Sequence, residues 1–134
     1  MGHFWKITMN KKYSEEDAKI SKRYSSIKSR VGYKLDWSRE DFIEWYKNEP
    51  QECHYCRTTH DDMVLFYNMQ ESKRSKTRGR TLEIDRKTDD KYSANNCVLC
   101  CYWCNNAKSD VFSYEEFINI GKAIGKTIKE KINH

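Results

Sequence analysis

The sequence predicts an α+β fold, a small zinc-stapled core of two strands and a helix with flanking N- and C-terminal helices. Two strand-like runs surround a polar loop between residues 80 and 110, two close cysteine pairs lie far apart in the chain, and amphipathic patterns precede and follow them. At 134 residues the chain is expected to form one compact domain. In it, residues 1–50 form a basic helical lead-in, and residues 51–134 form the zinc-bound core with its C-terminal helix.

The composition argues against a membrane-spanning protein. Hydrophobic residues make up 37% of the chain and mean hydropathy is −1.01, so the core is modest and a structural metal would help to stabilise it. No apolar run is long enough to span a bilayer, and the start MGHFWKITMN lacks the apolar region of a signal peptide. We therefore expect a cytoplasmic protein, in whose reducing surroundings cysteine pairs more often bind metal than form disulfides.

Basic residues gather in two stretches, 18–34 and 73–87, of a chain whose net charge is +5. Such clusters suit a polyanion such as nucleic acid, although one basic stretch alone is more often a solvated surface. Two stretches beside one candidate metal site favour nucleic acid. The candidate contacts are Lys22, Arg23, Arg30, Lys73, Arg74, Lys76, Arg78 and Arg80.

Two helices are expected before residue 50. Ser14, followed by three acidic residues, predicts the N-cap of the first helix, which should stop at Gly32. Ser38 caps the second helix, which should end before Pro50 because the residue before a proline avoids helical backbone. The apolar face of the first helix is formed by Ile20, Tyr24, Ile27 and Val31.

Four further elements are expected between residues 60 and 110. The run Met63–Tyr67 could form a short strand, and a polar, basic loop follows it. A strand over Leu82–Ile84 ends in Asp85-Arg86, and a second strand covers Cys97–Cys101. A helix is expected to open at Asn105.

The C-terminal helix begins with a capping box. Ser113 and Glu116 have the spacing in which side chain and backbone cap each other. Gly121 and Gly125 interrupt its apolar stripe, and glycine weakens a helix by about 1 kcal/mol relative to alanine. We therefore expect another part of the chain to pack closely at these two positions.

The six cysteines predict one structural zinc ion per chain. A four-thiolate site needs two close pairs, which Cys53-x-x-Cys56 and Cys101-x-x-Cys104 supply. The pair at 97 and 100 has the same spacing and competes for the role. We assign zinc to 101 and 104, because the tight turn follows Cys101, and we interpret Cys97 and Cys100 as small apolar fillers. Disulfides or free thiols are the alternative.

A second, catalytic metal is predicted between the strand and the helix. Asp85 at a strand end faces Asn105 at a helix start, and together they offer two oxygen ligands of the kind that Mg²⁺ or Mn²⁺ accepts. Such an ion could assist phosphodiester hydrolysis, which needs a nucleophilic water, a cation on the phosphate and a stabilised leaving oxygen. Taken singly, the two residues could be only a turn acid and a helix cap.

The segment around these residues resembles the HNH nucleases, whose fold is the ββα-metal motif. The resemblance covers residues 53–112 and rests on an upstream CxxC, a strand ending in aspartate, a loop, and the run NNCVLCCYWCNNAKSD. It implies a metal-dependent endonuclease acting on double-stranded DNA in a bacterial or phage-like setting. It also gives Asn96 and Lys108 places in the catalytic motif.

One position departs from the family pattern. The family's general base is a histidine after the aspartate, and Arg86 stands there. Arginine stays protonated at neutral pH and cannot be the base. The IDR-loop-YSANN and CNNAKSDVFS segments are similar to the PacI-type branch of restriction endonucleases, which implies Tyr92 as the base. His60 is the rival base.

The sequence therefore predicts a sequence-specific endonuclease of restriction or phage type, possible as a homodimer on a palindromic site. Two alternatives stay open: a zinc-stapled DNA-binding module that has lost catalysis, and a nuclease or binder directed at RNA.

Overall fold

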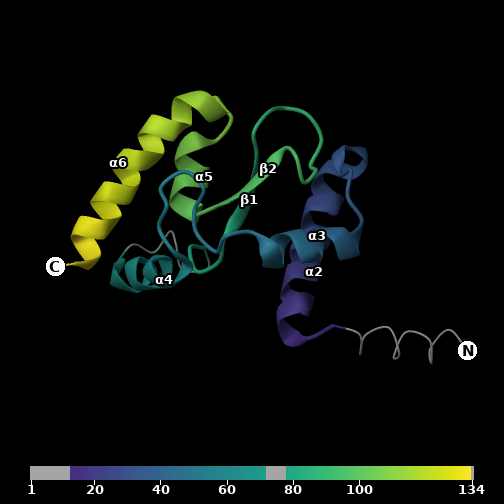
Figure 1. Cartoon of the computed structure of the whole chain (residues 1–134), viewed down its shortest axis with the longest axis horizontal. Coiled ribbons are helices and arrows are strands. Elements are labelled where there is room, and N and C mark those ends of the chain that lie inside the picture. The colour runs from purple at the N-terminus through teal and green to yellow at the C-terminus, as the bar shows by residue number, and fades with distance from the viewer. Residues whose placement is uncertain (1–12, 72–77, 134) are drawn as a thin grey trace, which may run out of the picture.

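The computed structural model describes residues 13–71 and 78–133. A two-stranded antiparallel hairpin lies at the centre of the fold, with α2 and α3 on one side and α4, α5 and α6 on the other (Figure 1). Strand β1 (Glu83–Arg86) pairs with β2 (Cys97–Cys100) so that Asp85 lies opposite Val98. The expected strands are therefore present, with β1 extending to Arg86 and β2 ending one residue before Cys101.

The two helices before residue 50 form as predicted. Helix α2 (Glu15–Val31) begins at Ser14, whose side chain accepts a hydrogen bond from the Asp17 N–H, and ends at Gly32 with φ +54°. A short 3₁₀ turn, η1 (Gly32–Lys34), leads to α3 (Arg39–Asn48), which Ser38 caps in the same way. The basic lead-in is thus a helix pair that packs on the hairpin.

The expectation of a strand at Met63–Tyr67 is wrong, because these residues lie in helix α4 (His60–Met69). Thr59 caps this helix by accepting a hydrogen bond from the Asp62 N–H. The acidic side chains in the first turn stabilise the helix further, because they lie at the positive end of its dipole. Met63 and Phe66 face the core at helical spacing. The capping signal therefore outweighs the strand-like composition.

Helix α5 (Tyr102–Lys108) also begins earlier than expected, inside the second cysteine pair instead of at Asn105. Its N-cap is Cys101, whose sulfur accepts a hydrogen bond from the Cys104 N–H. The same sulfur that is expected to bind zinc therefore starts the helix. Helix α6 (Tyr114–Ile132) has the predicted capping box at Ser113.

Two apolar clusters cover the hairpin. One joins α4, α6, the cysteine pairs and β2, around the fully buried Phe117 and Met63. The other joins α2 and α3 around Phe42 and includes Tyr92 and Cys97. Ile84 of β1 packs against both clusters, so the hairpin is held from two sides. Within the described ranges, no helix is both long and apolar enough to cross a bilayer.

Candidate metal centre and cavities

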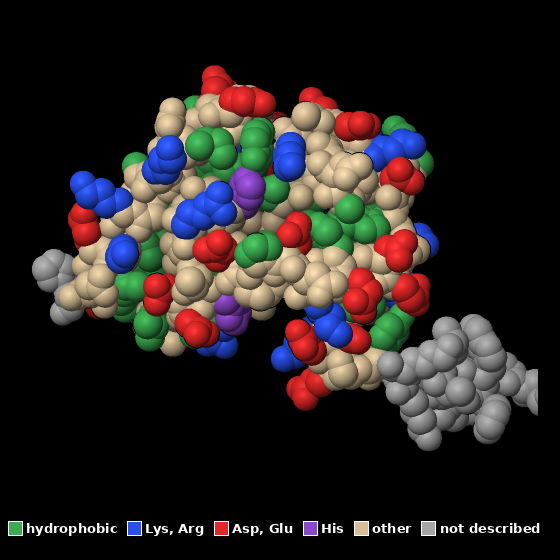
Figure 2. Space-filling view, viewed as in Figure 1, with side chains coloured by type: hydrophobic (Ala, Val, Ile, Leu, Met, Phe, Trp, Pro, Cys, Tyr) green, Lys and Arg blue, Asp and Glu red, His purple; other side chains and the backbone are tan. Residues whose placement is uncertain are grey.

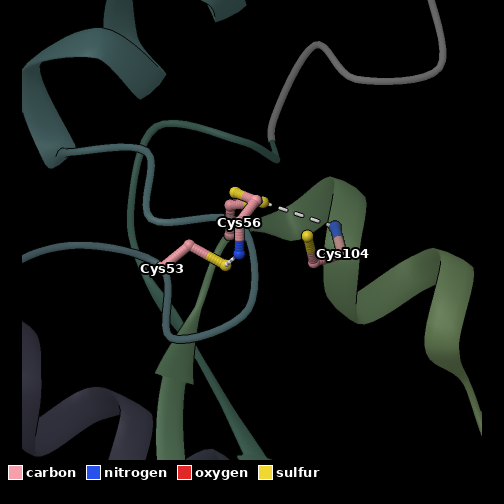
Figure 3. Close-up of side chains that lie close together, drawn as sticks. Cys53, Cys56 and Cys104 are labelled. Atoms are coloured by element: carbon pink, nitrogen blue, oxygen red, sulfur yellow. Dashed lines mark hydrogen bonds between the residues drawn. The ribbon is translucent and has the colours of Figure 1, made fainter. Parts of the chain in front are cut away.

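Four cysteine sulfurs come together at the point where the 53–56 turn meets the start of α5 (Figure 3). The Sγ atoms of Cys53, Cys56, Cys101 and Cys104 all lie within 4.8 Å of one another, and all four residues are buried. Sulfurs on a tetrahedral zinc, with Zn–S bonds of about 2.3 Å, are about 3.8 Å apart. The Cys56 and Cys101 sulfurs are 3.7 Å apart, so the cluster fits this ion.

Hydrogen bonds prepare the sulfurs for a metal. The Cys56 N–H points at Cys53 Sγ at 3.4 Å, and the Cys104 N–H points at Cys101 Sγ at 3.3 Å. Hydrogen bonds from backbone N–H groups favour the thiolate form of a cysteine, which is the form that binds zinc. The predicted choice of cysteines is therefore the one that the fold brings together.

Cys97 and Cys100 are buried outside this cluster. Cys97 packs in the α2–α3 cluster, and Cys100 is fully buried on the other side of the hairpin. Burial raises the pKa of the Cys97 thiol to about 11 and also raises the pKa of Cys100. Both therefore remain neutral thiols at pH 7, in keeping with their interpretation as fillers.

Asp85 and Asn105 line the same two cavities. The first, here called the α2 cavity, has a volume of about 640 Å³ and lies between α2 and β1. The second, here called the loop cavity, has a volume of about 810 Å³ and lies between the 87–96 loop and the α5–α6 turn. Tyr92 also lines both. Three of the predicted site residues therefore gather at the junction of β1, the loop and α5.

The Asp85 carboxylate is largely buried and has two partners on one oxygen. Lys108 Nζ lies 3.1 Å from Asp85 Oδ2, in an ion pair whose side chains are 7% and 13% exposed. The Tyr55 hydroxyl donates a hydrogen bond to the same oxygen. Lys108, which the resemblance places in the catalytic motif, therefore points inward to Asp85, because the end of α5 packs against β1.

Tyr92 is held by its backbone and its ring. Its N–H donates to the Lys34 carbonyl at 2.7 Å, and its carbonyl accepts from the Asp36 N–H at 2.9 Å. The guanidinium of Arg86 lies 4.7 Å from the centroid of the Tyr92 ring. Among the described residues, none forms a hydrogen bond with the Tyr92 hydroxyl, so this oxygen is available to a ligand.

The loop that carries Tyr92 is braced from within. Arg86 Nη1 donates to the carbonyls of Asp89 and Asp90 at 3.1 and 2.9 Å. Asn96 Oδ1 accepts from the Thr88 N–H at 3.2 Å, and Asn96 Nδ2 donates to the Lys91 carbonyl at 3.0 Å. The side chains of both Arg86 and Asn96 are therefore committed to the loop.

His60 lies away from this junction. It lines a different cavity, between α2 and α4, and its Nε2 is 3.0 Å from the Arg80 carbonyl oxygen. It does not line either cavity that contains Asp85. This position weakens the alternative in which His60 is the base.

The predicted nucleic-acid contacts divide into groups. Arg23, Arg30 and Arg78 line the α2 cavity together with Asp85. Arg80 lines the cavity of His60 and lies 4.8 Å from the Tyr67 ring centroid. Lys22 lines none of the cavities described above. Lys73, Arg74 and Lys76 lie outside the described residues.

The lining of the α2 cavity indicates an anion site more specifically than the net charge of the chain does. On the face seen in Figure 2, acidic and basic side chains are interspersed, so that face is not uniformly basic. The α2 cavity, by contrast, receives Arg23 and Arg30 from one helix. These cations share the cavity with Asp85 and Asn105, an arrangement that can hold a phosphate beside a carboxylate and an amide.

Sequence reasoning missed Tyr55. The residue lies between two zinc-binding cysteines, where its neighbours give no sign of a contact with Asp85, 30 positions later in the chain. The only local signal is that an aromatic residue occupies the turn. Only the packing of the turn against β1 identifies the contact.

Comparison with known proteins supports the fold. No family model and no curated protein matches this chain. Among solved structures, the chain is similar to that of the rare-cutting HNH restriction endonuclease PacI, whose description reports a mechanism of DNA perturbation. The TM-score is 0.68 with 25% sequence identity, over 86% of this chain and 80% of that chain. With the four-cysteine cluster, this likeness confirms the predicted α+β, zinc-stapled ββα-metal (HNH) fold.

Proposed function

We propose that this protein is a metal-dependent DNA endonuclease of the HNH type. The observation that carries the proposal is that Asp85, Asn105 and Tyr92 line one cavity with Arg23 and Arg30 of α2. A cavity lined both by oxygen ligands for a metal ion and by arginine side chains suits a phosphodiester. The likeness to PacI, an HNH restriction endonuclease, supports the same activity.

The catalytic ion would be Mg²⁺ or Mn²⁺, held by Asp85 and Asn105. A largely buried carboxylate that shares two cavities with an amide fits a hard cation that takes oxygen ligands and keeps several waters. When bound, this ion polarises the phosphate and stabilises the leaving 3′ oxygen. The four-cysteine cluster would hold a separate zinc ion, which has no open position and is structural.

Tyr92 is the proposed general base. Its phenolate oxygen would accept a proton from the water that attacks phosphorus, while the bond to the 3′ oxygen breaks. The Arg86 guanidinium lies 4.7 Å from the ring centroid and helps to hold the ring in place. Asn96 and Arg86 contribute by holding the loop in place.

The substrate is proposed to be double-stranded DNA, cut in a sequence-specific way by a protein of restriction or phage type. Arg23, Arg30 and Arg78 at the α2 cavity would contact phosphates or guanine edges. A homodimer would match a palindromic site, because two-fold sites are met by two-fold proteins. Light scattering of the purified chain with a cognate duplex measures that stoichiometry.

One observation favours a second candidate, a zinc-stapled DNA-binding module without catalysis. The Lys108 ammonium lies 3.1 Å from the Asp85 carboxylate and balances its charge, so the buried carboxylate does not need a metal ion as its partner. In that case the α2 cavity would bind a phosphate of the DNA backbone without cleaving the phosphodiester bond.

Incubation of the full chain with plasmid DNA in Mg²⁺ or Mn²⁺ separates the two candidates. We expect nicked or linear plasmid, and sequencing of the ends identifies the site. Asp85→Ala should abolish cleavage while zinc stays near one ion per chain. Glu44→Ala, which removes an exposed acid from α3, is the control and should cut normally. Tight DNA binding without cleavage by the wild type would favour the binding module, and cleavage by Asp85→Ala would refute the metal assignment.

A further inference from the structure

Tyr55 links the zinc-binding turn to the proposed catalytic aspartate. Its hydroxyl donates to Asp85 Oδ2, the oxygen that also pairs with Lys108 Nζ at 3.1 Å. Tyr55 is only 2% exposed, so water does not compete for this bond. Asp85 Oδ2 therefore has two fixed donors on its protein side.

The Tyr55 ring cannot easily move. Its backbone lies in the turn between Cys53 and Cys56, and its ring packs edge-on against Phe117 with centroids 5.2 Å apart. From α6, Gly121 approaches so closely that a Cβ there would lie 2.7 Å from the Tyr55 Cβ. The zinc cluster and α6 together fix the position of the hydroxyl.

The hydroxyl acts as a donor and not as a base. Its oxygen is hydrogen-bonded to Asp85 Oδ2, and a carboxylate oxygen can only accept, so the tyrosine hydroxyl supplies the hydrogen. This separates Tyr55 from Tyr92, whose hydroxyl has no hydrogen-bond partner among the described residues.

Both donors act on Oδ2, and no described residue forms a hydrogen bond with Oδ1. We propose that Tyr55 is a positioning residue that orients the Asp85 carboxylate, so that Oδ1 is presented to the divalent cation. This inference rests on the proposed metal-dependent function. It assigns the cysteine turn a role beyond stability, because the turn carries the group that orients a ligand of the other metal. Loss of a residue that forms a hydrogen bond with a metal ligand changes metal affinity or activity by roughly 10- to 100-fold.

Mn²⁺ binding to the zinc-loaded full chain tests the inference by calorimetry without DNA. We expect Tyr55→Phe, which removes only the hydroxyl, to weaken Mn²⁺ binding about 10-fold or more with zinc retained. The matched control is Tyr114→Phe. The Tyr114 ring contacts that of Tyr55, and its hydroxyl is hydrogen-bonded to His54 Nε2 at 2.6 Å. This variant should bind Mn²⁺ like the wild type. Tyr55→4-aminophenylalanine keeps a donor at the same place and should restore the affinity.

Each contrary outcome has a separate meaning. Unchanged Mn²⁺ affinity in Tyr55→Phe, or no recovery with the amino group, overturns the positioning role. Loss of zinc in Tyr55→Phe overturns it also, because the hydroxyl would then be needed to build the turn. Asp85→Ala identifies failure of the proposed function itself: if it binds Mn²⁺ as well as the wild type, the metal assignment is wrong whatever Tyr55 does.

Discussion

Gly125 of α6 lies directly against the backbone of Cys56. A Cβ at Gly125 would overlap the Cys56 carbonyl oxygen and lie 3.1 Å from its carbonyl carbon. The obstacle is backbone, which cannot rotate away as a flexible side chain can. The two glycines that weaken α6 therefore allow the helix to approach the zinc-binding turn.

Gly125→Ala should therefore destabilise the fold although alanine favours a helix. Overpacking costs about 1–3 kcal/mol, against about 1 kcal/mol gained in helix propensity. Because the clash pushes on Cys56, zinc should also be lost at a lower chelator concentration. Urea unfolding and chelator titration measure both effects. Lys126→Ala, at the next and exposed position, should change neither, and a more stable Gly125→Ala would mean that α6 does not pack there.

Zinc content should separate the six cysteines into two groups. Cys101→Ser removes a zinc ligand while keeping a side chain that can cap α5, so the zinc should fall well below one ion per chain and the chain should unfold more easily. Cys97→Ala removes only a buried filler and should keep the zinc. Metal analysis of the purified variants decides the assignment. If Cys97→Ala lost zinc and Cys101→Ser retained it, the zinc ligands would be Cys97 and Cys100 instead of Cys101 and Cys104.

Stability should fall at alkaline pH because of Cys97. Burial raises the pKa of this thiol from 9.0 to about 11, so between these values the folded chain holds a proton that the unfolded chain releases. The stabilisation is complete below pH 9 and is lost as pH rises towards 11, by about 1.4 kcal/mol per pH unit. Urea unfolding in a reducing buffer measures it. Cys97→Ala should show a shallower decline in this window, and an equal decline would exclude Cys97 as its source.

Local signals in the sequence were enough to predict α2, α3 and α6, the helices that serine side chains cap. Ser14, Ser38 and Ser113 each predicted a helix start that the structure contains. The start of α5 was predicted too late, because its cap is the sulfur of Cys101, which also belongs to the zinc cluster. The composition of the MVLFY run is typical of a strand, whereas the helix that the run forms is started by the Thr59 cap, which lies outside the run.

The candidate site was predictable where its residues follow a motif and not where they meet only in space. Asp85, Asn105 and Tyr92 stand at motif positions, and the fold brings them to the same cavities. The inward turn of Lys108 and the contact of Tyr55 depend on how α5 and the cysteine turn pack against β1. No sequence spacing encodes either contact, so both required the structure.

Arg30 should bind a DNA phosphate through the α2 cavity. It is exposed and shares that cavity with Asp85. Arg30→Ala should weaken binding to all duplexes and reduce the slope of log affinity against log salt by about 1. Lys28→Ala makes the same charge change at an exposed position of α2 outside the cavity. Fluorescence anisotropy over a salt series compares them, and equal effects would mean that the basic helix acts only through its total charge.

Tyr92→Phe should reduce cleavage and leave DNA binding nearly unchanged. The phenyl ring keeps its place beneath Arg86, and only the oxygen that would accept the proton is removed. Loss of a general base slows a reaction by about 10²- to 10⁴-fold, and single-turnover cleavage at saturating DNA measures that step directly. Tyr33→Phe changes a tyrosine that is 85% exposed and should cut at the wild-type rate. If Tyr92→Phe also cuts at that rate, the water is activated by another group, since Arg86 is occupied with the Asp89 and Asp90 carbonyls and His60 lies in a different cavity.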